Sequence, residues 1–229
     1  MSPLLFRLHH HPLDPASRRV RLTLAEKGIS FETVLEKPWD PRPDFLAISP
    51  AGCVPVLAIE TEDSPLLLSG ATSICEYLEE TEGAPNLLGK DAIRRAEVRR
   101  LVEWFEIRTY AEVTSHLLEE KAVKRLCGGG EPDSARIRVG YHNIHGHLAY
   151  VGWLIERRNW LAGEDLSYAD LAAAAQFSTI DYLGDVPWDK HPSAKDWYAR
   201  LKSRPAFRSI LGDHLAGLLP PKHYADLDF

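Results

Sequence analysis

Methionine and cysteine are scarce in this chain of 229 residues, which contains one methionine and three cysteines. Cys53, Cys75 and Cys127 form no CxxC pair and no metal-type spacing, which argues against a disulfide framework or a zinc module. No apolar run approaches the roughly 20 residues needed to span a bilayer, and MSPLLFRLHH has too short an apolar run for a signal peptide. We therefore expect a reduced, cytoplasmic protein without membrane insertion.

The chain also has no excess of basic residues. It contains 27 lysines and arginines and 33 acidic residues, which gives a formal net charge of −6. This balance opposes non-specific attraction to nucleic acid or anionic lipid. Apolar residues make up 45% of the chain, which is enough for a sizeable core in one large or two small domains. The composition predicts a globular protein that binds no nucleic acid.

The hydrophobic pattern divides the chain into two halves. Residues 1–82 read as a β-α-β unit, a proline-rich loop, two further strands and a helix. From about residue 88 the strand signals end, and amphipathic helical segments follow at 91–122, 134–158, 168–183 and 192–203. We predict an α/β domain over 1–82, an all-helical domain over 88–217 and an extended tail over 218–229.

Two helix starts are marked by specific residues. Asp14 with Pro15 and Ser17 fits an N-cap, a first-turn proline and a third position. Ser167 and Asp170 have the spacing of a capping box, in which each side chain bonds the other residue's amide. Both motifs predict the start of a helix, and we assign no catalytic role to Ser167 or Asp170.

The order of these elements and four motifs resemble the glutathione S-transferase family over nearly the whole chain. The motifs are SRRVRLTLAEKGI, SPAGCVPVL, SICEYL and GEDLSYADL. The resemblance implies a thioredoxin-like N-terminal domain and the helical C-terminal domain of that family. It also implies a cis peptide bond between Val54 and Pro55, where the backbone of family members pairs with glutathione.

The side chains that family members use for glutathione are replaced here. By this resemblance, Asp14 stands where serine-type members carry the hydroxyl that bonds the thiolate, and a carboxylate there would disfavour that thiolate. Gly70 and Ala71 stand where an acidic residue or glutamine and then a serine hold the γ-glutamyl group. The site at Asp14, Val54, Pro55, Gly70 and Ala71 is therefore predicted to be degraded and to hold no catalytic residue, and Ser17 is the fallback hydroxyl of the alternative in which the chain is an active transferase.

The ending PPKHYADLDF and the loop EKPWDPRPDF resemble one branch of the family, the division regulators of alphaproteobacteria that bind the tubulin-like protein FtsZ. This resemblance implies a homodimer without transferase chemistry and without a cofactor, which acts at the division site on filament curvature and constriction. The residues assigned to partner binding are Trp39, Tyr224, Asp226, Asp228 and Phe229.

Four other readings stay open, and a metal site is set aside. The chain could be a working glutathione transferase that uses Ser17, or a scaffold for another cytosolic protein. Trp39 could instead fold back onto its own domain, and the tail could act as a structural clasp. The histidines at 9–11 and at 142, 145 and 147 lack an added carboxylate or cysteine at ligand spacing, so we predict no metal site.

Overall fold

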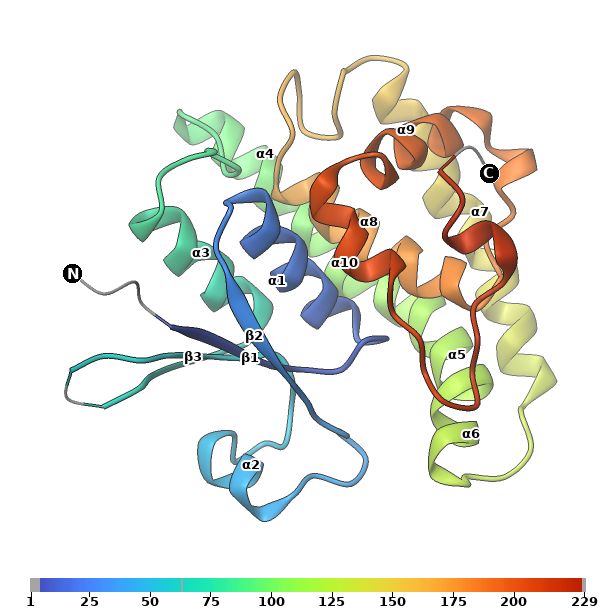
Figure 1. Cartoon of the computed structure of the whole chain (residues 1–229). Coiled ribbons are helices and arrows are strands. Elements are labelled where there is room, and N and C mark those ends of the chain that lie inside the picture. Colours follow the sequence, from blue (N-terminus) through green and yellow to red (C-terminus); the bar gives the residue numbers. More distant parts are fainter. Residues whose placement is uncertain (1–4, 63, 228–229) are drawn as a thin grey trace. The chain divides into compact units, whose positions relative to one another are not determined.

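The computed structural model describes residues 5–62 and 64–227, and the chain divides into two compact units, Met1–Pro85 and Asn86–Phe229. Asp228 and Phe229 of the tail, which were predicted to bind the partner, lie outside the described residues. The first unit follows the predicted order of strands and helices (Figure 1). Its elements are β1 (Phe6–His10), α1 (Pro15–Glu26), β2 (Phe31–Leu35), α2 (Pro43–Ile48), β3 (Val56–Ile59), β4 (Leu66–Ser69) and α3 (Ala71–Thr81).

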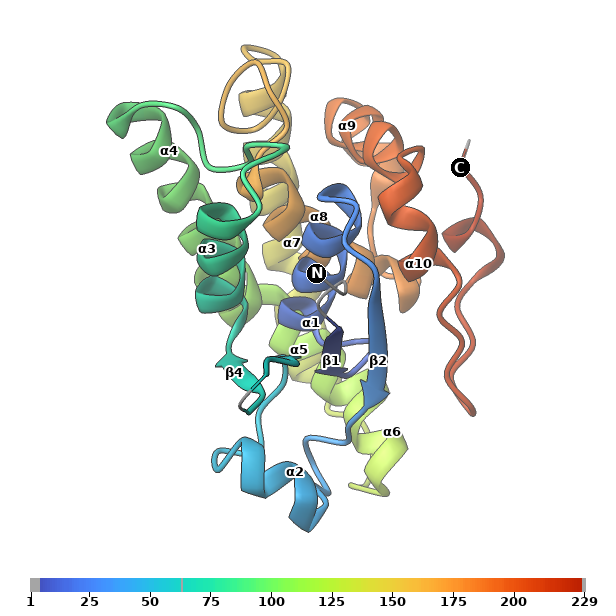
Figure 2. The ribbon, with the colours of Figure 1, turned by 60° about the vertical axis from the view of Figure 1, so that its left-hand side comes forward.

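The sheet of the first unit has the strand order β2-β1-β3-β4. Strands β1 and β2 run parallel, whereas β3 is antiparallel to both β1 and β4. All four residues of β3 are buried, as expected for a strand inside a sheet that is covered by other structure. Helices α1 and α3 lie beside each other (Figure 2), and Thr23 and Cys75 join them at 3.4 Å between Oγ1 and Sγ.

The sequence analysis predicted only a loop between β2 and β3. This prediction was wrong, because helix α2 lies between these strands. The helix begins at Pro43, which suits the first helical position because proline lacks an amide hydrogen. Phe45 is fully buried and stacks on His9 with 5.7 Å between ring centroids. This tertiary contact holds a helix of six residues, which is too short to be stable by itself.

The second unit is helical, as predicted. A continuous helical stretch from Ala92 to Cys127 alternates α and π geometry, and long helices follow it. The elements are α4 (Ala92–Glu103), η1 (Trp104–Thr114), α5 (Ser115–Leu118), η2 (Glu119–Val123), α6 (Lys124–Cys127), α7 (Ser134–Ile155), α8 (Tyr168–Tyr182), η3 (Trp188–Lys190), α9 (Pro192–Lys202), η4 (Pro205–Phe207), α10 (Arg208–Leu211) and η5 (Lys222–Tyr224).

Helix α8 is the centre of the second unit, because every one of its residues is buried. The predicted capping box at Ser167 and Asp170 is present and starts this helix. Asp170 is fully buried, and it also accepts hydrogen bonds from the Leu161 amide at 2.9 Å and from Trp197 Nε1 at 3.0 Å. One carboxylate therefore links the start of α8 to the preceding loop and to α9.

Candidate functional site

The start of α1 confirms the capping role predicted for Asp14. Its carboxylate accepts a hydrogen bond from the Ser17 amide at 2.6 Å, and Pro15 takes the first helical position. A carboxylate that accepts from the first turn also complements the positive end of the helix. At this position the structure therefore offers a helix cap in place of a hydroxyl.

Ser17 is an unsuitable substitute for the missing hydroxyl in this conformation. The residue is fully buried, and its Oγ accepts a hydrogen bond from the His11 amide at 3.4 Å. A hydroxyl that stabilises a thiolate has to donate to the sulfur from an accessible position. The burial of Ser17 argues against the reading that this residue replaces the missing serine.

The remaining positions of the predicted site lie together in the first unit. The Val54–Pro55 peptide bond is cis, as predicted. The Gly70 amide donates to the Pro55 carbonyl at 3.0 Å, which places the start of α3 beside this peptide. Sequence reasoning therefore assembled Val54, Pro55, Gly70 and Ala71 correctly as neighbours.

The start of α3 lacks side chains that could bind an amine or a carboxylate at these two positions. Gly70 has φ +87°, a left-handed backbone conformation that glycine adopts readily and other residues rarely do. Ala71 is buried, and α3 has no side-chain hydrogen bond at its cap. The exposed hydroxyls nearby belong to Ser69, Thr72 and Ser73.

We expect glutathione to bind weakly or not at all, because two polar contacts are missing. Each lost charge-assisted hydrogen bond is worth about 1.5 to 3 kcal/mol, so the two losses together weaken binding by roughly 100-fold or more. Isothermal titration with glutathione measures this directly. Ala71→Ser, which returns one hydroxyl, should raise the affinity. Micromolar affinity of the unchanged protein, with turnover that disappears in Ser17→Ala, would contradict the prediction.

The loop that carries Trp39 is held by a buried carboxylate. Glu36 is almost completely buried and accepts two hydrogen bonds from Arg42, at 3.1 Å and 2.7 Å. Its Oε1 also lies 2.7 Å from His9 Nδ1. Burial alone would raise the pKa of Glu36, but the hydrogen bonds to Arg42 and His9 lower it, so the carboxylate stays charged. The ends of the loop are therefore fixed to each other.

Trp39 itself is half-buried. Its ring meets His11 edge-on, with 5.0 Å between the ring centroids. This contact fits the reading that Trp39 packs on its own unit, while the accessible part of the indole leaves room for a partner. An indole that is apolar and still partly accessible is the type of side chain that is enriched at protein interfaces.

The tail prediction is corrected at Tyr224, which was expected to be an exposed apolar anchor. The side chain is fully buried, its hydroxyl donates to the Ile210 carbonyl at 3.2 Å, and its ring packs edge-on against Tyr182. Tyr224 therefore belongs to the core of the second unit. Asp226 and Leu227 remain exposed beyond it.

A buried charge cluster beneath the tail was missed by sequence reasoning. Lys202 is 1% exposed and donates to the His223 carbonyl at 3.2 Å. His223 Nε2 lies 3.4 Å from the buried carboxylate of Asp181. Burial raises the pKa of Asp181 and lowers that of Lys202, although the two groups attract each other. Asp181 near the end of α8 and Lys202 at the end of α9 are distant in sequence, so no local signal marks their contact.

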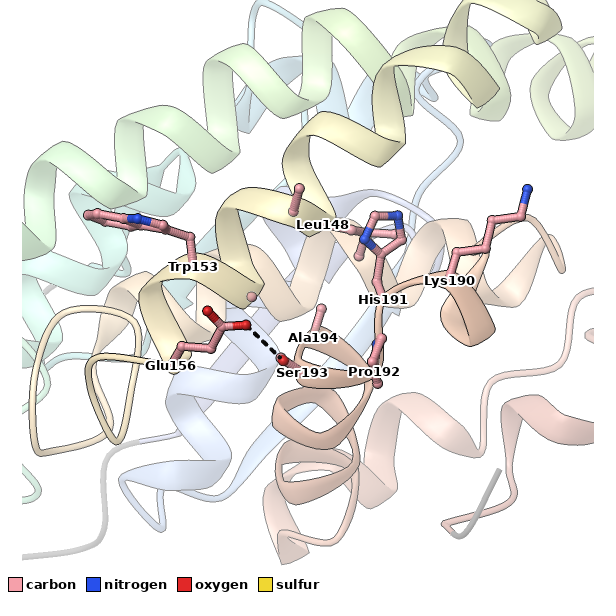
Figure 3. A pocket seen from close by; sticks show the side chains of 10 residues that line it. Leu148, Trp153, Glu156, Lys190, His191, Pro192, Ser193 and Ala194 are labelled. Atoms are coloured by element: carbon pink, nitrogen blue, oxygen red, sulfur yellow. Dashed lines mark hydrogen bonds between the residues drawn. The ribbon is translucent and has the colours of Figure 1, made fainter.

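A shallow pocket of about 300 Å³ lies in the second unit between α7 and the start of α9 (Figure 3). Leu148 and Ala194 supply apolar lining, and Ser193 donates to Glu156 at 3.3 Å across it. His191 Nε2 lies 2.9 Å from His145 Nδ1. Within the described residues, no group of three or more His, Cys, Asp or Glu side chains has the arrangement of a metal site. In the same residues, no helix is long and apolar enough to cross a membrane.

Comparison with known proteins identifies the class to which this fold belongs. Residues 15–81 match the model of the glutathione S-transferase N-terminal domain, and residues 147–205 match that of the C-terminal domain. The chain belongs to the glutathione S-transferase family. It is 49% identical to FtsZ-localized protein A of Caulobacter vibrioides over 222 residues. This alignment covers 97% of each of the two chains.

Two solved structures are similar over almost their whole length. FzlA from C. crescentus superposes with a TM-score of 0.96 at 48% sequence identity, covering 98% of this chain and 99% of that one. A glutathione S-transferase from Rhodospirillum rubrum F11 superposes with a TM-score of 0.94 at 53% identity, covering 98% and 100%. Relatives of comparable similarity therefore carry both a name that refers to FtsZ and a transferase name.

Proposed function

We propose that this protein binds FtsZ and regulates filament curvature and constriction in bacterial cell division. The observation that carries the proposal is the 49% identity, over 97% of both chains, to a relative named for its localisation with FtsZ. The degraded polar positions at Asp14, Gly70 and Ala71 support a role without ordinary transferase chemistry. We place the protein in the cytoplasm at the division site.

The surfaces proposed for FtsZ are the Trp39 loop and the end of the tail. Trp39 is half-buried on a loop that Glu36 and Arg42 brace, so little conformational entropy would be lost on docking. Asp226 is exposed and adds directional charge, and Asp228 and Phe229 complete the same segment. Tyr224 contributes by holding this segment in place and not by direct contact.

We also propose a symmetric homodimer, which the family resemblance implies. Two-fold pairing presents two copies of each surface, and a filament offers many copies of the partner site. Binding through both copies would then raise the apparent affinity without any new contact. Analytical ultracentrifugation at micromolar concentration reports the mass.

Removal of residues 226–229 should weaken co-sedimentation with FtsZ filaments by about 30-fold or more. The reason is that loss of interface anchors typically costs about 2 kcal/mol or more of binding free energy. The thermal midpoint should change little, because the truncated chain keeps the buried Tyr224. The matched single change Asp228→Lys should weaken binding in the same direction.

Full FtsZ binding by the truncated chain would refute the assignment of the tail. A large fall in the thermal midpoint would favour the reading of the tail end as a clasp. Failure of the unchanged protein to sediment with FtsZ would leave the scaffold reading for another protein.

The alternative function is an active glutathione transferase. Its support is the fold, shared with relatives such as glutathione S-transferase 2 of Saccharomyces cerevisiae at 28% identity over 89% of this chain. The burial of Ser17 argues against it. The glutathione titration described above separates this alternative from a division role.

A further inference from the structure

The pocket between α7 and the start of α9 plays no part in the proposed binding of FtsZ (Figure 3). Its floor is apolar, because Leu148, Gly152 and Ala194 line it and all three residues are buried. A Cβ placed on Gly152 would lie 3.6 Å from Cβ of Ser193, which is an ordinary van der Waals distance. A methyl group would therefore fit here, and its absence leaves the floor of the pocket open.

Trp153 on α7 forms one wall of the pocket. It is 49% exposed, and the guanidinium carbon of Arg157 lies 4.6 Å from the centroid of its ring. Arg157 also donates to the Trp153 carbonyl at 2.8 Å. An exposed indole beside an apolar floor offers contact area to a hydrophobic group of a ligand.

Two opposite charges lie on either side of the pocket. Figure 3 shows Glu156 on the side of Trp153 and Lys190 on the other side. Glu156 accepts a hydrogen bond from the Ser193 hydroxyl at 3.3 Å, and Arg157 lies 3.7 Å away, so the carboxylate oxygens keep room for a further donor. Lys190 is exposed and has no hydrogen-bond or ion-pair partner among the described residues. Each of the two charges can therefore take a ligand group of the opposite sign.

His191 lies between these two charges in Figure 3 and does not add a third. Its Nε2 lies 2.9 Å from His145 Nδ1, and burial together with the nearby His145 and Lys190 lowers the pKa of His191. The ring is therefore neutral at pH 7. The groups between Glu156 and Lys190 are thus uncharged.

We propose that this pocket binds a free α-amino acid with an apolar side chain. The ammonium group of the ligand bonds to Glu156, its carboxylate bonds to Lys190, and its side chain packs on the apolar floor beside Trp153. A volume of about 300 Å³ lies at the lower end of the range for ligand pockets, which suits a single amino acid. The flexible stem of Lys190 lets its ammonium group meet the carboxylate. The described residues that line the pocket are distinct from the surfaces proposed for FtsZ, so each proposal can fail without the other.

Titration of the ¹⁵N-labelled protein with L-phenylalanine tests the site. Peak shifts of the Trp153 indole N–H and of backbone amides around the pocket should report a Kd of about 1 mM. Hydrocinnamate lacks the amine and phenethylamine lacks the carboxylate, so each should bind about fivefold more weakly, the effect of losing one partly exposed charge contact. Trp153→Phe identifies the indole peak.

Two variants assign the two charges. Glu156→Gln should weaken binding of L-phenylalanine about fivefold and leave that of hydrocinnamate within about twofold, because hydrocinnamate has no amine. Lys190→Gln should weaken binding of L-phenylalanine by a similar factor and leave that of phenethylamine within about twofold. A general disturbance of the fold would weaken binding of all three probes alike and would contradict these assignments.

Gly152→Ala tests the floor of the pocket. The added methyl group should weaken binding of L-phenylalanine about tenfold, while the thermal midpoint should not fall, because alanine favours a helix more than glycine does. Gly146→Ala is the matched control on the same helix, because a Cβ there would meet no atom within 4 Å and the residue does not line this pocket. Its affinity for L-phenylalanine should stay within about twofold of that of the unchanged protein.

The absence of peak shifts at about 20 mM L-phenylalanine would overturn the proposal. Equal affinities for the three probes would exclude recognition of both charged groups and would overturn it as well. Unchanged binding by Gly152→Ala, or equal weakening by Gly146→Ala, would show that the ligand does not lie on this floor and would also overturn it.

Discussion

Tyr224→Ala should lower the free energy of unfolding by about 3 to 5 kcal/mol, the range for removal of a buried aromatic ring. The side chain has no exposed surface, and its ring packs 5.2 Å from that of Tyr182 between centroids. The change also leaves the Ile210 carbonyl without its hydroxyl donor. For a chain of this size, the thermal midpoint should fall by roughly 6 to 20 °C, which scanning calorimetry measures.

Two variants separate the contribution of the Tyr224 ring to stability from that of its hydroxyl and from that of the rest of the tail. Tyr224→Phe keeps the ring and should cost only about 1 kcal/mol, the net value of one hydrogen bond. Leu227→Ala removes a side chain that is 45% exposed and should change stability by about 0.5 kcal/mol or less. A midpoint for Tyr224→Ala equal to that of the unchanged protein would show that the tail is not anchored in this way.

The expected instability of Tyr224→Ala decides how FtsZ binding must be tested. Any loss of binding in this variant would follow from release of the chain beyond α10, because the ring is not accessible to a partner. Contact residues must therefore be sought among exposed positions such as Asp226.

Asp170→Ala is expected to cost a further large amount of stability, about 3 to 5 kcal/mol. The carboxylate accepts from the Ser167 amide at 3.1 Å and the Ser167 hydroxyl at 2.9 Å, besides Leu161 and Trp197. Each buried donor that loses its acceptor costs about 1 to 3 kcal/mol. Burial raises the pKa of Asp170 and so opposes its charged form, and the four hydrogen bonds offset only part of this effect.

Ser167→Ala is the matched control for the capping box. It removes only the serine side chain from the box and should cost about 1 kcal/mol. Urea unfolding of both variants measures the difference. If Asp170→Ala proved no more destabilising than Ser167→Ala, the buried network around the carboxylate would not have the importance assigned to it.

Local capping was predictable, whereas the anchoring of the tail was not. Asp14 and Asp170 each bond an amide three residues away, so their roles can be recognised in a few consecutive letters. Tyr224 contacts Tyr182, which lies 42 positions earlier in the sequence. A pattern of acidic and aromatic residues in a tail has the same appearance whether its tyrosine is exposed or buried.

The predicted glutathione site also contains one feature that the sequence predicted and one that only the structure revealed. The motif alignment placed Gly70 and Ala71 at the start of a helix beside the Val54–Pro55 bond, and the structure has them there. The burial of Ser17 could not be predicted, because a serine in the first turn of a helix can face either solvent or the interior.

The sequence by itself determined the two-part architecture, the main helices and strands, the helix caps and the family. The architecture, the elements and the caps depend on periodicity and on contacts between near neighbours, which the order of residues specifies directly, whereas the family was implied by the resemblance of four motifs. Only the tertiary structure decided that Phe45 holds α2, that Glu36 and Arg42 brace the Trp39 loop, and that the tail is anchored while Leu219 is exposed. Those outcomes depend on which distant segments bury one another, and burial sets both the strength of a hydrogen bond and the accessibility of a side chain.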